Sequence, residues 1–255
     1  MSMRVLLALA LIAGVTAPSD ARTAQTSKSS KSEKSGKKKG KKSKKKQVSR
    51  IPSAATLKNV KNMPRGYVWP PNKVMLAAED QCASELTEAG VESTPAKSEG
   101  RIVSAIALPM DETGAFTLGG VTYRSAFGSK NSRMDCQLAL ALERFGPELS
   151  AAGVHEVKFG SIYRWTNVRV NGETKPILSR HALGIAMDIV SLIDADGREA
   201  NVKRDYKQDD ELLLAAEHAV NASGKFRTLL TPKNDPISHS DHFHIEVAVD
   251  YTAPQ

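Results

Sequence analysis

The sequence lacks several features that would quickly assign a class of protein. Among its 255 residues it has only two cysteines, and its longest apolar run, residues 5–15, is about half of the ~20 residues that a membrane-spanning helix needs. It contains no internal repeat, no Gly-x-Ser-x-Gly motif and no Ser-Pro repeats. A serine enzyme with a nucleophile elbow and a repeat protein are therefore not indicated.

Residues 1–21 have the pattern of a cleavable export signal. Arg4 precedes the apolar run, and small residues around Ala21 occupy the positions that a signal peptidase reads. We expect the mature chain to start near Arg22 and the protein to be periplasmic or secreted and associated with the cell envelope. A membrane anchor is the alternative interpretation.

Residues 22–50 are rich in lysine and nearly devoid of apolar side chains. With eleven Lys, two Arg and one Glu the stretch has a formal charge of +12, whereas the whole chain has +8, so residues 51–255 are acidic overall at −4. Such a segment predicts a disordered tether. In an exported protein we expect it to adhere to an anionic envelope surface and expect no nucleic acid partner; a solubilising linker is the alternative.

The cysteines are Cys82 and Cys136. In an oxidising compartment, two cysteines without a third to compete predict one disulfide, although two free thiols remain an alternative. The loop that it closes spans more than fifty residues, for which chain entropy gives about 4 kcal/mol of stabilisation. Its role is expected to be structural.

The remaining chain predicts one α+β domain with a mainly antiparallel central sheet flanked by helices. Four prolines between residues 51 and 76 predict an extended segment there, followed by the domain at 77–255. Apolar periodicity and turn residues give the expected elements in order: helix 77–86, strand 101–110, helix 134–152, strand 154–163, polar loop 164–176, strand 184–194, helix 209–221, a loop with Pro232 and Pro236, and strand 242–249.

Histidines concentrate near the end of the chain, since five of the six follow residue 180. Side chains alternate along a strand, so two neighbouring strands can bring Asp188 and His244 together, with His181 supplied by the preceding loop. Two imidazoles and one carboxylate with an open fourth position form the ligand set of a catalytic zinc. His242, two residues from a ligand, is positioned to take a proton from water. Hydrogen-bonded structural histidines and adventitious metal binding are the alternatives.

Two motifs in this region resemble a known group of metallopeptidases. SRHALGIAMD (179–188) matches the SxHxxGxAxD motif, and HFH (242–244) the HxH motif, of the group that joins D-Ala-D-Ala carboxypeptidases with lysostaphin-type endopeptidases. The histidine spacing is similar to that of the penicillin-insensitive murein endopeptidases. Over residues 78–250, the order DCQLALAL, FGSIYRWTN, LSRHALGIAMDIV, DHFHIEVA resembles the bacterial extensin-like C-terminal domain family.

The resemblance implies a D-Ala-D-Ala metallopeptidase-like fold with a zinc site on the sheet, one ion per chain, bound by His181, Asp188 and His244. It also implies His242 as general base, His239 as a second histidine near the water and Arg164 as a group that contacts the substrate carbonyl or carboxylate, with a surface salt bridge as the alternative for Arg164. The chain departs from these families at two points. The extensin-like family usually reads SYSCR where this chain reads SIYRWTN, and the carboxypeptidases use a glutamate as base where the candidate here is a histidine.

Two further residues are expected to support the site. Ser179 is expected to cap or orient the loop before His181. Glu246 shares the expected strand face with His244 and is expected to fix the tautomer of a histidine.

We therefore expect an exported zinc metallopeptidase that hydrolyses peptide cross-links of peptidoglycan as an endopeptidase. One alternative is a D,D-carboxypeptidase, in which Arg164, Arg169 or Arg180 binds the terminal carboxylate. The other is a non-catalytic zinc-containing envelope-binding module, which requires His242 or Glu246 to close the metal site.

Overall fold

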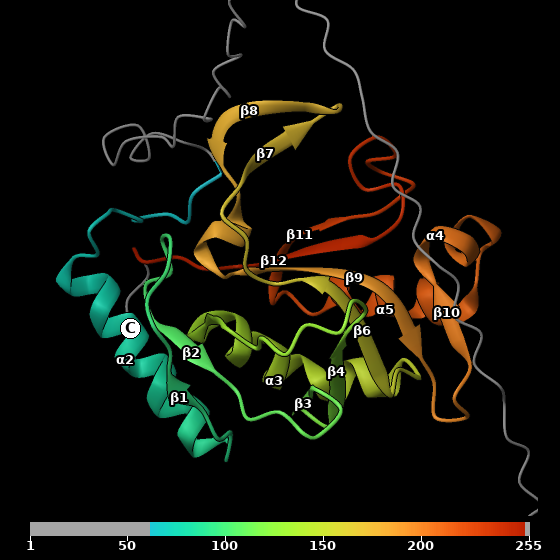
Figure 1. Cartoon of the computed structure of the whole chain (residues 1–255), viewed down its shortest axis with the longest axis horizontal. Helices are drawn as coiled ribbons and strands as arrows, with labels where there is room; N and C mark the ends of the chain where they lie inside the picture. The colour runs from blue at the N-terminus through green and yellow to red at the C-terminus, as the bar shows by residue number, and fades with distance from the viewer. Residues whose placement is uncertain (1–61, 253–255) are drawn as a thin grey trace, which may run out of the picture. The chain divides into compact units, whose positions relative to one another are not determined.

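The computed structural model describes residues 62–252 (Figure 1). The expected export signal, the lysine-rich tether and residues 51–61 lie outside the described residues. Between residues 62 and 252, no helix combines the length and apolarity needed to cross a membrane.

A seven-stranded sheet organises the domain and confirms the α+β class. Its strands follow the order β11-β12-β9-β6-β4-β3, and β10 pairs with β9 beside this path. All the pairings are antiparallel except that of β4 with β6. The strand bounds are β3 Ala115–Leu118, β4 Val121–Ser125, β6 Glu156–Ser161, β9 Ala186–Ile193, β10 Glu199–Asn201, β11 Phe226–Leu230 and β12 Phe243–Val247.

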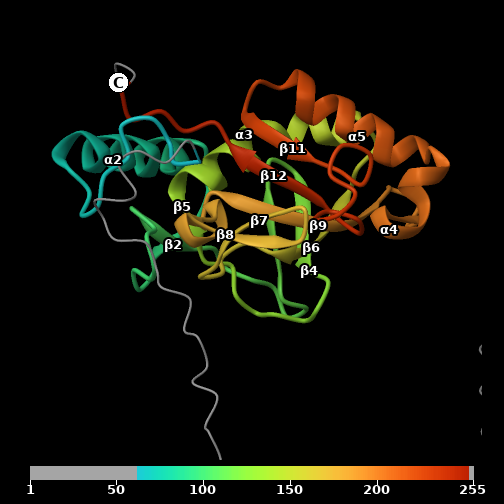
Figure 2. The same cartoon turned by 90° about the horizontal axis from the view of Figure 1, so that it is seen from above.

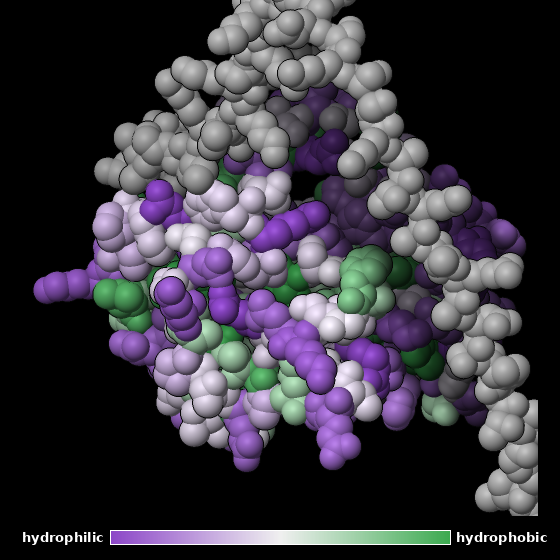
Figure 3. Space-filling model, in the orientation of Figure 1, coloured by the Kyte–Doolittle hydropathy of each residue, from purple (hydrophilic) through white to green (hydrophobic). Residues whose placement is uncertain are grey.

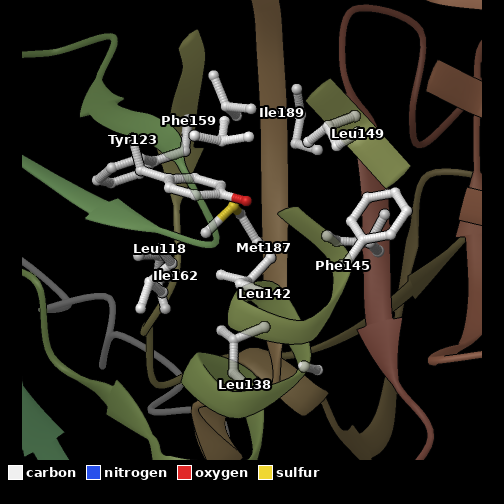
Figure 4. Close-up of a cluster of buried hydrophobic side chains, with 14 of the residues drawn as sticks. Leu118, Tyr123, Leu138, Leu142, Phe145, Leu149, Phe159, Ile162, Met187 and Ile189 are labelled. Carbon is white, nitrogen blue, oxygen red and sulfur yellow. The ribbon is translucent and has the colours of Figure 1, made fainter. Parts of the chain in front are cut away.

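Two helices, α3 (Cys136–Ala151) and α5 (Glu211–Ala222), pack against one face of this sheet (Figures 1 and 2). Apolar side chains from alternate strand positions, among them Phe159 and Met187, meet the helix side chains there. Figure 4 shows this core, in which each fully buried large apolar side chain contributes about 1.5–3 kcal/mol. The opposite face of the sheet carries polar residues of the same strands, among them Asp188 on β9 and His244 on β12.

The helix α2 (Lys73–Glu88) packs against α3, and the Cys82–Cys136 disulfide joins the two, as expected from the sequence. It starts at Lys73, so the expected extended segment ends four residues early and the expected helix is too short. The reason is local: Pro70 and Pro71 precede Asn72, whose side chain accepts a hydrogen bond from the Met75 amide and caps the first turn.

The expected strand 101–110 is mostly wrong, because only β2 (Ala105–Ala107) forms. The Val103 and Ser104 amides instead donate to the Asp135 carboxylate, and this removes them from strand pairing. β2 forms a three-stranded sheet with β1 (Thr94–Pro95) and β5 (Met134–Asp135).

Two segments expected to be loops contain strands. Residues 164–178 fold into the hairpin β7 (Asn167–Val170) and β8 (Glu173–Leu178), whose turn has Asn171 and Gly172 at positive φ, and β11 forms between 225 and 242. Asn-Gly favours this hairpin turn, but its strands are largely exposed and lack a clear apolar alternation. The β3–β4 hairpin was also not expected. Short helices complete the domain: η1 Arg180–Leu183, α4 Val202–Asp205 and η2 Tyr206–Gln208.

The surface that Figure 3 displays is mostly hydrophilic, and its apolar patches are small and separated. Where described residues form this face, they offer no large apolar area of the kind that marks a permanent protein interface.

Candidate metal centre

Three polar residues occupy one rung on the sheet face opposite α3 and α5. In the strand register Asp188 on β9 lies beside Ser161 on β6 on one side and His244 on β12 on the other. The antiparallel pairing of β12 with β9 therefore brings Asp188 and His244 together, although 56 residues separate them in the chain.

His181 reaches the same point from η1. The Ser179 hydroxyl accepts a hydrogen bond from the His181 amide and caps this short helix, which ends at Gly184 with φ +70°. A Cβ at Gly184 would lie 2.8 Å from the Asp135 backbone nitrogen, so both the left-handed conformation and the close approach require glycine. The turn places the His181 imidazole, which is fully buried, against the rung.

The three expected metal ligands converge closely. His181 Nε2 lies 3.0 Å from Asp188 Oδ1 and 3.1 Å from His244 Nδ1, and His244 Nδ1 lies 2.9 Å from the same Asp188 oxygen. The three residues are buried, and they form a group whose ligand atoms all lie within 4.8 Å of one another.

Hydrogen bonds on the far side of each ring determine which nitrogens face inward as acceptors. His181 Nδ1 donates to the Ile162 carbonyl at 2.7 Å, and His244 Nε2 donates to Glu246 Oε1 at 3.2 Å. In these tautomers two imidazole lone pairs and a carboxylate oxygen point at one another. Such an arrangement is stabilised by a cation, either a shared proton or a metal ion.

Asp188 uses its two oxygens differently. Oδ2 accepts from the Ser161 hydroxyl at 2.8 Å and forms an ion pair with Arg164 at 3.0 Å, whereas Oδ1 faces the two histidines. Arg164, expected to contact the substrate, is thus paired with an expected ligand, and its side chain is still 51% exposed. The carboxylate is held in the orientation that offers one oxygen to a metal.

Glu246 is held behind His244 by two arginines. Its Oε2 lies 3.5 Å from the buried Arg180 and 3.6 Å from Arg227, while Oε1 accepts from His244. Arg180 also donates to the carbonyls of Asn62 and Val247, so it is not free to bind a substrate carboxylate.

Burial and the neighbouring charges shift the pKa of each expected ligand. Burial lowers the pKa of His181, and although burial acts to raise the pKa of Asp188, its histidine neighbours hold that pKa well below the usual range. For His244, burial acts to lower the pKa, but hydrogen bonds to the Asp188 and Glu246 carboxylates outweigh it and raise the pKa to about 9. The site therefore favours positive charge at its centre.

The other two histidines lie at the side of this group. His242 precedes β12 instead of lying on it as expected, and its Nδ1 donates to Asp241 at 2.8 Å. Its Nε2 is buried 3.5 Å from Asp188 Oδ1 and has no hydrogen-bond partner among residues 62–252. The His239 ring contacts the rings of both His242 and His244, and its Nδ1 donates to Asp235 at 2.8 Å.

Pockets open on both sides of the group. One, of about 390 Å³, is lined by the β7 residues, part of β11 and the loop before β12, together with His181 and His244. The other, of about 300 Å³, is lined by Phe127, Val190 and Asp188, among others. Arg164 and His242 line both, so the two pockets meet at the expected metal site.

The sequence reasoning missed four supporting groups: the Ser161 hydroxyl, the Ile162 carbonyl, and the Asp235 and Asp241 carboxylates. Asp241 is adjacent in sequence to His242, and Asp235 is four residues before His239, so a search for carboxylates near each histidine would have found both. The contacts of Ser161 and Ile162 depend on tertiary pairing and leave no local signal.

Comparison with known proteins gave one match. The family model described as "Extensin-like protein C-terminus" matches residues 80–253. No curated protein and no solved structure matched.

Proposed function

Since this chain belongs to the extensin-like C-terminal family, we propose that it is a metallopeptidase that hydrolyses peptide cross-links of peptidoglycan as an endopeptidase. The observation that carries the proposal is the convergence of three buried acceptors, His181 Nε2, His244 Nδ1 and Asp188 Oδ1, within 3.1 Å of one another.

The residues fit a zinc ion. Two imidazoles and one carboxylate are the protein ligands that catalytic zinc uses, and each is held by a further hydrogen bond, as metal ligands usually are. Because the pKa of His244 is raised to about 9, zinc binding would release a proton from this ring. When bound, zinc supplies a Lewis acid that polarises a carbonyl and lowers the pKa of water toward ~7.

The remaining polar groups supply the other requirements of peptide hydrolysis. His242 holds a buried lone pair at Nε2 because Asp241 accepts its Nδ1 proton, so it accepts a proton from attacking water and passes it to the leaving amine. The His239 ring packs against the His242 ring and limits the space through which water and substrate reach His242. The exposed part of Arg164 stabilises negative charge on the substrate carbonyl.

Cleavage inside a chain is favoured over removal of a terminal residue because pockets continue on both sides of the site. A carboxypeptidase needs a pocket that closes beyond one residue and ends in a cation. Arg180, one of the three arginines considered for that role, is buried and occupied by backbone carbonyls.

A non-catalytic zinc-containing module is the second candidate, and one contact favours it. His242 Nε2 lies 3.5 Å from Asp188 Oδ1, so a small movement of the ring makes it a fourth ligand and closes the site. The two candidates predict different zinc contents for His242→Ala. If His242 is a fourth ligand, the variant loses zinc; if His242 is a general base, the variant keeps zinc.

Export and envelope attachment complete the proposal. Residues 1–21 direct secretion and the lysine-rich residues 22–50 adhere to anionic envelope polymers, which places the peptidase near its substrate.

The test is digestion of purified peptidoglycan sacculi by the zinc-loaded protein, with muropeptides identified by mass spectrometry. We expect cross-linked dimers to become monomers with the wild type. His181→Ala and His244→Ala should lose both zinc and activity, and His242→Ala should keep zinc and lose roughly 10²–10⁴ in rate.

Other outcomes identify the alternatives. Hydrolysis by a zinc-free His181→Ala protein contradicts the mechanism. Release of terminal D-Ala alone indicates a carboxypeptidase, and unchanged sacculi with tightly bound zinc, lost in His242→Ala, indicate the binding module.

A further inference from the structure

The larger pocket beside the metal centre has an excess of positive charge. Three arginines line it, Arg164, Arg169 and Arg227, against two carboxylates, Asp235 and Glu246. Positive charge that is concentrated in a concave surface attracts anionic groups of a ligand.

Both carboxylates already have partners. Asp235 accepts from His239 and from the Ser238 amide, and Glu246 accepts from His244 and lies against the buried Arg180. They are therefore less able to neutralise the arginines that remain in the pocket.

Two of the arginines have unused donors. Arg169, on β7, makes no side-chain hydrogen bond or ion pair among residues 62–252. Arg227, on β11, is 36% exposed, and its contacts are a 3.6 Å approach to Glu246 and a 3.4 Å hydrogen bond to the Asn62 carbonyl. Arg164, by contrast, is paired with Asp188.

The pocket on the other side of the centre differs in character. There Arg164 and Lys203 face Asp188 and Asp241, so the formal charges balance, and Phe127 and Val190 contribute apolar surface. Because Arg164 lines both pockets and is paired with Asp188, the two sides differ in Arg169 and Arg227, whose guanidinium donors are largely unused and lie on the β7–β11 side.

We propose that Arg169 and Arg227 form an anion subsite that binds a carboxylate of the substrate, on the β7–β11 side of the bond that is cut. The guanidinium group suits this ligand because its planar donors match the two oxygens of a carboxylate. This inference rests on the proposed peptidase function. The carboxylate is carried either by a side branch of the peptide or by its terminus.

The test uses a synthetic cross-linked peptide dimer in three forms: all carboxylates free, only the terminal carboxylates amidated, and only the branch carboxylates amidated. Binding is measured by calorimetry with zinc-loaded His242→Ala, and kcat and KM are measured with the zinc-loaded wild type. We expect one amidated form to bind about tenfold more weakly, with KM raised and kcat little changed.

The Arg169→Gln variant should bind the free and the amidated forms almost equally, whereas Lys175→Gln, which removes one positive charge from the same hairpin outside the pocket, should keep the preference. Arg227→Gln should act in the same direction, and its zinc content is checked because Arg227 also contacts Glu246.

The outcomes separate the inference from the function. If cross-links are cut but Arg169→Gln and Arg227→Gln both keep the full preference for the carboxylate, the subsite is wrong and the peptidase stands. If the preference is lost in the variants, for branch or for terminal carboxylates, the subsite stands. If the wild type then releases only terminal D-Ala and leaves the cross-link uncut, the subsite stands and the endopeptidase is wrong. If zinc-loaded protein neither binds nor cuts any form, both are wrong.

Discussion

At the scale of single residues, Glu246 controls which nitrogen of His244 faces His181 and Asp188 at the proposed metal site. Its carboxylate accepts the Nε2 proton and leaves Nδ1 as the acceptor that meets His181 and Asp188. Glutamine at this position still accepts a hydrogen bond but removes the negative charge that makes the imidazole a stronger ligand.

We predict that Glu246→Gln lowers the zinc affinity by about 10- to 100-fold, measured by competition with a chromophoric chelator. Glu148→Gln is the matched control, because Glu148 pairs with Lys225 and does not line either pocket at the metal centre. Equal affinities in the two variants would show that the hydrogen bond from His244 does not support metal binding.

The positions of His181, Asp188 and His244 could be foreseen from the sequence because strand alternation and the motif spacing determine them. Ser161 could not, because its contact with Asp188 depends on the register between β6 and β9, which shifts at two points. For Arg164, an ion pair was the alternative that the sequence offered, but its partner Asp188 was not foreseeable, since a loop arginine in a sequence carries no sign of the carboxylate that it meets.

At the scale of elements, a buried glutamate connects α2 to the rest of the domain. Glu79 is 3% exposed and accepts a hydrogen bond from the Tyr251 hydroxyl at 2.8 Å, which ties the helix to the end of the described chain. Burial raises its pKa from 4.5 to about 9, and the negative charge of Asp135 adds to the shift. This shift favours the protonated form of Glu79 in the folded protein.

This shift predicts a dependence of stability on pH. Because the pKa of Glu79 is higher in the folded than in the unfolded state, its contribution is fully present below pH 4.5 and is lost as the pH rises to about 9. The slope of the free energy of unfolding should reach at most about 1.4 kcal/mol per pH unit from this group. Glu79→Gln should flatten the curve in urea denaturation between pH 5 and 9.

Glu88→Gln, an exposed change on the same helix, serves as the comparison and should leave the slope unchanged. Parallel curves for wild type and Glu79→Gln would mean that Glu79 is ionised in the folded protein, contrary to this prediction.

Elements with a strong apolar periodicity could be predicted from the sequence, whereas elements with mostly exposed residues could not. Residues 134–152 were expected to form a helix and α3 spans Cys136–Ala151, because its apolar side chains repeat at helical spacing. The β7–β8 hairpin has mostly exposed or half-buried residues on both strands, so no burial pattern distinguished it from a loop.

At the scale of the whole molecule, the disulfide is the main covalent constraint on the domain. It joins residues 54 apart, from α2 to the start of α3, and the metal centre lies outside this loop in the chain. The mixture of parallel and antiparallel pairings in the sheet could not be foreseen from the sequence. The parallel pairing of β4 with β6 depends on the path of α3, which connects these two strands in the chain.

We predict that replacing both cysteines by serine lowers the free energy of unfolding by about 4 kcal/mol, from the entropy of the released loop. Guanidinium denaturation of the folded variant measures the change, and zinc content measured beside it should be unaltered. A variant as stable as the wild type would show that residual structure already restricts this loop in the unfolded chain.

The shared rung of Ser161, Asp188 and His244 links metal content to correct folding. A slip of β12 by one residue would turn His244 toward the helices and Phe243 toward the site, so the core and the ligand set would be lost together. If the proposed zinc site is correct, a chain that retains zinc has paired these strands correctly, and bound metal is then an assay of strand register during refolding.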